Sequence, residues 1–142
     1  MIARMTEVLE TIRQVPLFSG LSEKQLKRLV NVMAERVFPE GKAITTEGGG
    51  GVGFFVILAG TATVSRGGEA IRTLGPGDHF GEIALIDNGP RSATIVADTE
   101  LRCRGLTAWQ FRPLVQENAE IAWPLLEALT ARLREAEARS AS

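Results

Sequence analysis

The chain has 142 residues, of which 44% are hydrophobic and 23% are charged, a composition typical of one globular domain and not of a disordered or fibrous protein. Its 16 Lys and Arg residues against 17 Asp and Glu residues give a formal net charge of −1, which disfavours binding to nucleic acid by charge alone. One cysteine and one histidine cannot form a structural zinc site or an internal disulfide, so we expect no metal, no cofactor and a reducing, cytoplasmic setting.

Apolar residues at helical spacing predict two short helices within residues 1–35. Ser22, followed three residues later by Gln25, has the form of a capping box, in which each side chain bonds the backbone N–H of the other residue. Charges interrupt the first residues before an apolar run develops, and the longest apolar run, residues 54–59, is too short to span a bilayer. We therefore expect neither a signal peptide nor a membrane segment.

Residues 36–106 contain short runs rich in β-branched and aromatic residues, separated by turns rich in glycine and proline. The predicted strands cover residues 43–46, 54–58, 61–65, 70–74, 92–97 and 101–104. Turns this close together leave no room for the crossover helices of a parallel sheet. The pattern therefore predicts an antiparallel sandwich or barrel.

Helical spacing returns at Thr107, where Gln110 completes a second capping box, and predicts two helices over residues 107–142. Pro113 and Pro124 lie inside these helices. Because a proline removes one helix hydrogen bond and crowds the preceding turn, we expect a break or a kink near each of them.

A turn-rich segment, residues 75–94, places one carboxylate and one guanidinium between two strands. If residues 81–85 form one helical turn, its N–H groups favour a negative ligand group, and Arg91 offers a planar fork of donors to phosphate oxygens. Glu82, when ionised, accepts a hydrogen bond from a sugar hydroxyl. Together they suit a ribose cyclic phosphate, whereas the alternative interpretation is a surface ion pair between Glu82 and Arg91.

The same segment resembles the phosphate-binding cassette of cyclic nucleotide-binding domains. The matching residues are Phe80-Gly81-Glu82-Ile83-Ala84-Leu85 and Pro90-Arg91-Ser92-Ala93-Thr94, and residues 15–22, 38–41, 55–60 and 74–78 also resemble that family. The resemblance implies a mainly β, α+β fold: an eight-stranded antiparallel jelly-roll β-barrel, or double-stranded β-helix, flanked by helices. It implies one domain over residues 1–142, with N-terminal helices in 1–35, a β-roll in 36–106 that carries the cassette 80–94, and lid helices in 107–142.

The resemblance also implies roles for single residues. It assigns the ribose 2′-hydroxyl to Glu82 and the cyclic phosphate to Arg91. Backbone N–H groups near other residues of the cassette bind the remaining phosphate oxygens, and the full ligand-binding set is Phe80, Gly81, Glu82, Ile83, Ala84, Arg91, Ser92 and Ala93. The final helix covers the base, with Leu126, Leu129, Arg132 and Leu133 as lid candidates and Arg134 as an alternative to Arg132.

Other residues leave alternatives open. The family's equivalent of the Ser92 hydroxyl can meet a guanine edge and favour cyclic GMP, although serine occurs in cyclic AMP binders too. Trp109 and Trp123 either cap the base or pack onto the sheet. Cys103 is expected to be a small buried residue and not a nucleophile, and His79 is read as a turn or packing residue without a role.

These observations predict a stand-alone cyclic nucleotide sensor of bacterial type that prefers cAMP, has cGMP as its second candidate ligand and is not an enzyme. Binding is expected to move the final helix, which an effector protein of unknown identity then detects. The alternative is an interaction module that kept the fold and lost the ligand. A metal-dependent enzyme on this scaffold would need several His or carboxylate ligands. A homodimer through the final helix stays an open alternative.

Overall fold

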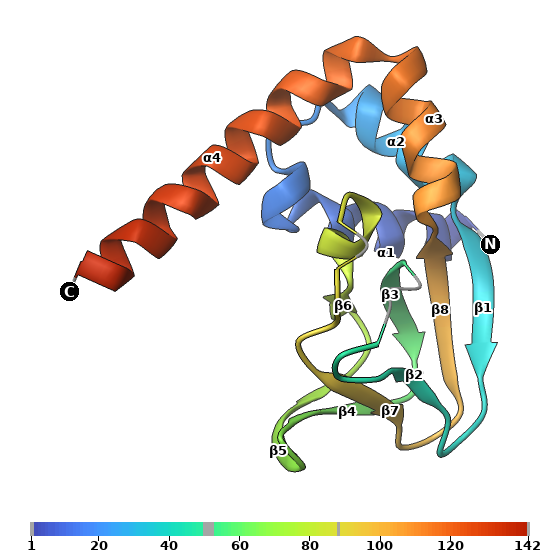
Figure 1. Cartoon of the computed structure of the whole chain (residues 1–142). Helices are drawn as coiled ribbons and strands as arrows, with labels where there is room; N and C mark the ends of the chain where they lie inside the picture. Colours follow the sequence, from blue (N-terminus) through green and yellow to red (C-terminus); the bar gives the residue numbers. More distant parts are fainter. Residues whose placement is uncertain (1, 50–52, 88, 142) are drawn as a thin grey trace.

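The computed structural model describes residues 2–49, 53–87 and 89–141, which form helices at both ends of the chain and strands between them (Figure 1). The helical elements are α1 (Ile2–Arg13), η1 (Pro16–Phe18), α2 (Glu23–Val32), η2 (Glu82–Leu85), α3 (Ala108–Glu117) and α4 (Ala119–Ala141). The strands are β1 (Ala34–Phe38), β2 (Ala43–Thr45), β3 (Phe54–Ala59), β4 (Ala62–Arg66), β5 (Glu69–Leu74), β6 (His79–Phe80), β7 (Thr94–Ala97) and β8 (Leu101–Leu106).

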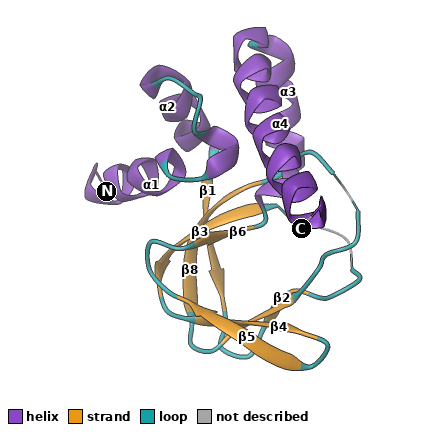
Figure 2. Ribbon diagram, turned by 90° about the vertical axis from the view of Figure 1, so that its left-hand side faces the viewer, coloured by secondary structure: helices purple, strands orange, loops and turns teal. Residues whose placement is uncertain are grey.

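The strands form two four-stranded antiparallel sheets, in the orders β1-β8-β3-β6 and β2-β7-β4-β5. Figure 2 shows all the long helices on one side of this roll. The expected eight-stranded jelly roll flanked by helices is confirmed, and each of the six predicted runs overlaps a strand. The sequence reading missed β1, β6 and the short helix η1.

Both predicted capping boxes are formed. Ser22 Oγ accepts from the N–H of Gln25 at 3.2 Å, and the Ser22 N–H donates to Gln25 Oε1 at 2.9 Å. At the start of α3, Thr107 and Gln110 exchange the same two bonds, at 3.3 and 2.9 Å. These side chains satisfy backbone donors that the first turn of a helix leaves without partners, so α2 and α3 begin where the sequence predicts.

Of the expected break or kink at the prolines, the break does not occur, because Pro113 lies inside α3 and Pro124 lies inside α4. Pro124 has no N–H for the Glu120 carbonyl, which instead accepts from Gln25 Nε2 at 3.4 Å. A Cβ added to Gly20 would lie 3.1 Å from Pro124 Cβ, so the glycine leaves room for the proline ring. Contacts from α2 and its preceding loop thus accommodate Pro124, and the break between helices falls at Asn118.

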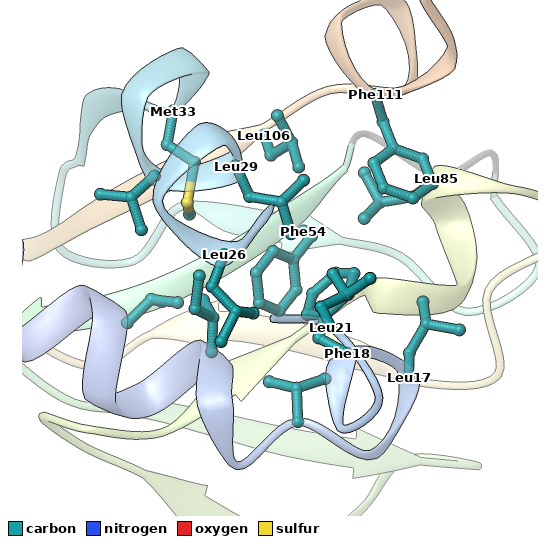
Figure 3. Packing of buried hydrophobic residues seen from close by; sticks show 14 of the residues in the cluster. Leu17, Phe18, Leu21, Leu26, Leu29, Met33, Phe54, Leu85, Leu106 and Phe111 are labelled. Carbon is teal, nitrogen blue, oxygen red and sulfur yellow. The ribbon is translucent and has the colours of Figure 1, made fainter. Parts of the chain in front are cut away.

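Buried apolar side chains form two clusters. The helical cluster lies between the helices and the roll (Figure 3) and comprises Val8, Ile12, Val15, Leu17, Phe18, Leu21, Leu26, Leu29, Val30, Met33, Phe54, Val56, Leu85, Leu106, Phe111, Ile121 and Leu125. The roll cluster lies between the sheets and comprises Phe38, Ile44, Phe55, Ile57, Ala62, Val64, Leu74, Phe80, Ile95, Ala97, Leu101 and Cys103. None of the described helices combines the length and the apolarity that a bilayer crossing needs.

Candidate ligand-binding site

A cavity of about 620 Å³ opens between η2, the loop after it, the β4–β5 hairpin and Arg132 of α4. Its volume falls in the range of small-molecule sites, roughly 300–1,000 Å³. Every residue of the predicted ligand-binding set lines it: Phe80, Gly81, Glu82, Ile83, Ala84, Arg91, Ser92 and Ala93. The structure therefore brings the whole predicted set together around one cavity.

The predicted helical turn at residues 81–85 is confirmed as η2, which begins after Gly81. Gly81 has φ +88°, and a Cβ there would overlap the carbonyl oxygen of Gly53 and lie 3.0 Å from Arg91 Nη2. Only glycine fits this conformation and this space without strain. The Ala84 N–H already donates to the Gly81 carbonyl at 3.0 Å, so in this conformation it is not free to bind phosphate.

Arg91 is held through its backbone and its side chain. Its N–H donates to the Gly49 carbonyl and its own carbonyl accepts from the Gly48 N–H, both at 2.8 Å. Nη2 donates to the Gly53 carbonyl at 3.1 Å, whereas Nε is buried without a hydrogen-bond partner among the described residues. Burial lowers the pKa of Arg91, and the nearby Glu82 carboxylate raises it in part. The guanidinium is thus fixed in place and keeps a donor unused.

Glu82 projects from the start of η2, and its side chain is only 17% exposed. Oε2 lies 3.5 Å from His79 Nδ1, and Oε1 lies 3.8 Å from Arg132 Nη1. Burial raises the pKa of Glu82, but the contact with His79, the carboxylate's bond to its own backbone and the charge of Arg132 together bring it below the ordinary value. Glu82 is therefore an ionised hydrogen-bond acceptor at neutral pH.

The alternative of a surface ion pair between Glu82 and Arg91 is not what forms. Within the described part of the chain, Glu82 lies within ion-pair distance of His79 and Arg132, and not of Arg91. The carboxylate and the Arg91 guanidinium both line the cavity, where each can meet a different group of one ligand.

His79, to which the sequence reading gave no role, lines the cavity and contacts Glu82. Its position follows from pairing of β6 with β3, where His79 lies opposite Val56. The β4–β5 hairpin adds Arg66, Ile71 and Arg72 to the cavity wall, which the sequence reading also missed. The register of that hairpin, in which Arg72 lies opposite the buried Val64, determines that these residues face the cavity. They could have been predicted only if the pairing of β4 with β5 were already known.

Of the lid candidates, only Arg132 lines the cavity. Leu126 and Leu129 line a second, apolar cavity of about 530 Å³ between η2, α3 and α4. Leu133 is 60% exposed, and Arg134 is exposed too. In this conformation α4 therefore presents an arginine, and not its leucine stripe, to the predicted ligand site.

The structure also shows how far the two tryptophans and the cysteine are buried. Trp109 and Trp123 are 89% and 67% exposed, so the expectation that they cap the site or pack onto the sheet is wrong for this conformation. Both project from the outer surfaces of their helices. Cys103 is fully buried in the roll cluster, as expected, and burial raises the pKa of its thiol to about 12.

Comparisons with known proteins agree with this geometry. The sequence profile described as "Cyclic nucleotide-binding domain" matches residues 35–118, more than half of the chain. A "cAMP-dependent protein kinase regulatory subunit" of Yarrowia lipolytica is 35% identical over 106 residues, covering 73% of this chain and 28% of that protein. A "Cyclic AMP receptor protein" of Thermus thermophilus is 32% identical over 127 residues, covering 86% of this chain and 59% of that protein.

The chain thus spans less than two thirds of each of these two relatives. A solved structure of similar extent is the N-terminal domain of a transcriptional regulator from Streptomyces coelicolor A3(2). It superposes with a TM-score of 0.80 at 30% identity, covering 89% of this chain and 92% of that one. On the profile match and this likeness, the chain belongs to the cyclic nucleotide-binding domain family.

Proposed function

We propose that this chain is a sensor that binds a purine cyclic nucleotide, cAMP in preference to cGMP, and that it is not an enzyme. The observation that carries the proposal is that one cavity is lined by an ionised carboxylate, only 17% exposed, and by a guanidinium that donates to a backbone carbonyl. Arg91 binds the cyclic phosphate, which carries a single negative charge, and Glu82 accepts from the ribose 2′-hydroxyl. The base lies toward the apolar side chains that line the same cavity, Val64, Ile71 and Ile95.

The relatives support cAMP as the preferred ligand and regulation as the role. The relatives are described as a cAMP-dependent kinase's regulatory subunit and a cyclic AMP receptor protein, which are names of regulators. Ser92 is exposed at the cavity, where its hydroxyl can also accept or donate toward a guanine edge, so cGMP is the second ligand to test. Incubation with cAMP and analysis for AMP tests the non-enzymatic role, because any turnover contradicts it.

The output of the sensor is a change in α4. Arg132 of α4 lies within ion-pair distance of Glu82, so a ligand that meets Glu82 changes the surroundings of the helix. Leu126 and Leu133 are 53% and 60% exposed on α4 and offer a surface to an effector protein. A second copy of the chain is the other occupant of that surface, and sedimentation with and without nucleotide distinguishes the two.

Calorimetric titration of nucleotide-free protein with cAMP and with cGMP tests the proposal. Arg91→Ala is expected to weaken binding by roughly 1.5–3 kcal/mol, the worth of a hydrogen bond to a charged group, which is about a 10- to 150-fold loss of affinity. Arg134→Ala, an exposed arginine of α4 that does not line the cavity, is the matched control.

Unchanged affinity in Arg91→Ala contradicts the proposed phosphate contact. Absence of binding and of thermal stabilisation with both nucleotides contradicts the sensor and favours the alternative, an interaction module that kept the fold.

A further inference from the structure

The carboxylate of Glu47 joins two parts of the wall of the ligand cavity, although Glu47 does not itself line that cavity. Its Oε1 accepts from the N–H of Gly67, at the tip of the β4–β5 hairpin, at 2.8 Å. Its own N–H donates to Oγ1 of Thr94, the first residue of β7, at 2.9 Å. One residue therefore connects the hairpin to the end of the cassette.

The backbone on either side of Glu47 is fixed on the cassette. Residues 48–49 exchange two hydrogen bonds with the backbone of Arg91, both at 2.8 Å. Thr45, which is 4% exposed, donates from its hydroxyl to the Ala93 carbonyl at 3.1 Å. Because this segment is bonded to the cassette, the carboxylate of Glu47 has a defined position relative to the phosphate-binding part of the cavity.

The hairpin has little packing at its tip. β5 is the last strand of its sheet, as Figure 2 shows, and five of its six residues are exposed. Gly67 and Gly68 turn the chain with φ of +62° and +80°, and a Cβ added to either would contact nothing within 4 Å beyond its chain neighbours. Besides the bond to Glu47, Arg66 Nε donates to the Ser92 carbonyl at 3.0 Å, so hydrogen bonds hold the tip in place.

The side chains of this hairpin form the wall that faces the base in the proposed function. Four of them line the cavity: Val64, Arg66, Ile71 and Arg72. A shift of the hairpin would move these side chains together. A wall that is held in its binding position before the ligand arrives avoids the entropy cost of ordering it during binding.

We infer that Glu47 is a positioning residue for the nucleotide: by binding the Gly67 N–H, it holds the β4–β5 hairpin in the position that ligand binding requires. The inference rests on the proposed function, because it concerns the wall that the base contacts there. Glu47 acts on the affinity without touching the ligand. The bonds that support Arg91 come from backbone groups of residues 48–49, so a change of the Glu47 side chain leaves them in place.

The test compares the affinity for cAMP, by calorimetry, in wild type, Glu47→Ala, Glu47→Gln and Glu69→Ala. Glu47→Ala removes the acceptor and is expected to weaken binding about 3- to 10-fold, the range that one hydrogen bond accounts for. Glu47→Gln keeps an amide oxygen that can accept from Gly67, so it should retain most of the affinity. Glu69→Ala is the matched control, because it removes the same charge from an exposed position of the same hairpin that does not line the cavity.

Amide hydrogen exchange of the nucleotide-free proteins gives a second measurement. Residues 66–70 should exchange faster in Glu47→Ala than in wild type and in Glu47→Gln, while exchange in the helices should not change. This pattern distinguishes a local release of the hairpin from a general loss of stability.

An affinity of Glu47→Ala equal to that of wild type overturns the inference. So does an equal loss in Glu47→Gln or in Glu69→Ala, because the charge and not the bond would then account for it, and so does unchanged exchange of the hairpin in Glu47→Ala. Wild-type protein that binds neither cAMP nor cGMP overturns the proposed function and this inference with it, whereas binding that is insensitive to Glu47 overturns this inference alone.

Discussion

The two apolar clusters hold different parts of the molecule in place. The roll cluster contains Phe80 and Ile95, which line the ligand cavity, so it forms the floor of the site. The helical cluster contains Leu125 of α4 and Leu85 of η2, and it anchors the helices. The site's floor and the helix that carries Arg132 therefore rest on separate cores.

Strand β3 joins the two cores. Phe54 and Val56 belong to the helical cluster, and Phe55 and Ile57 belong to the roll cluster. Successive side chains of a strand point to opposite faces, so one continuous apolar run supplies both. Neighbouring residues of β3 should therefore have separable effects on the helices and on the roll.

Phe54→Ala and Phe55→Ala give the largest expected effect. Both side chains are buried, and each substitution should cost about 3–5 kcal/mol of unfolding free energy, measured by urea denaturation. Amide hydrogen exchange should then rise chiefly in α1, α2 and α3 for Phe54→Ala, and in β1, β6 and β8 for Phe55→Ala. Val37→Ala, at an exposed residue of β1, serves as the control with an effect within about 0.5 kcal/mol. The same exchange pattern in both phenylalanine variants would show that the clusters act as one core.

The second prediction concerns Glu82, whose carboxylate faces both the roll and α4. Its folded-state pKa lies below the ordinary value of 4.5, so its contribution to stability is present above pH 4.5 and is lost as the pH falls through the folded-state pKa. Glu82→Gln should therefore lower the unfolding free energy at pH 7, and its difference from wild type should shrink as the pH is lowered below about 4.5. Urea denaturation over this pH range, with the exposed Glu127→Gln as control, measures this. A difference that is constant with pH would contradict it.

The smallest expected effect is on the reactivity of the Cys103 thiol. Its thiol is buried in the roll cluster with a pKa of about 12, so the folded protein should react only slowly with iodoacetamide at pH 8 and fully in urea. Phe55→Ala should accelerate the reaction more than Phe54→Ala, because only Phe55 belongs to the same cluster. Rapid alkylation of folded wild-type protein, followed by mass spectrometry, would contradict the burial.

Local signals in the sequence predicted most of the fold. The capping boxes at Ser22 and Thr107 were predictable because each is complete within four residues. Strand β1 was missed because four of its five residues are exposed and give no apolar alternation. Strand β6 has two residues and exists only through pairing with β3. No break occurs at Pro124, and the Glu120 carbonyl that lacks its helix partner there accepts from Gln25, which lies 95 residues earlier and so gives no local signal.

The residues of the candidate site likewise fall into those that a local motif predicts and those that depend on tertiary packing. Its main residues lie within the cassette, residues 80–94, where one short motif specifies them, and all line one cavity. Arg132 and its neighbours on α4 were not distinguishable from the sequence, because the packing of the whole helix on the helical cluster decides which side chain reaches Glu82. His79 was missed because its contact depends on the fold of the turn between β6 and η2.

The placement of the two tryptophans gives this chain a built-in optical reporter. It has two tryptophans and no tyrosine, and both indoles are exposed, one on α3 and one on α4. Its ultraviolet fluorescence therefore comes almost wholly from the C-terminal helices and hardly at all from the roll that holds the ligand. A change in emission colour or intensity when a nucleotide is added would record the response of those helices, without any dye or substitution.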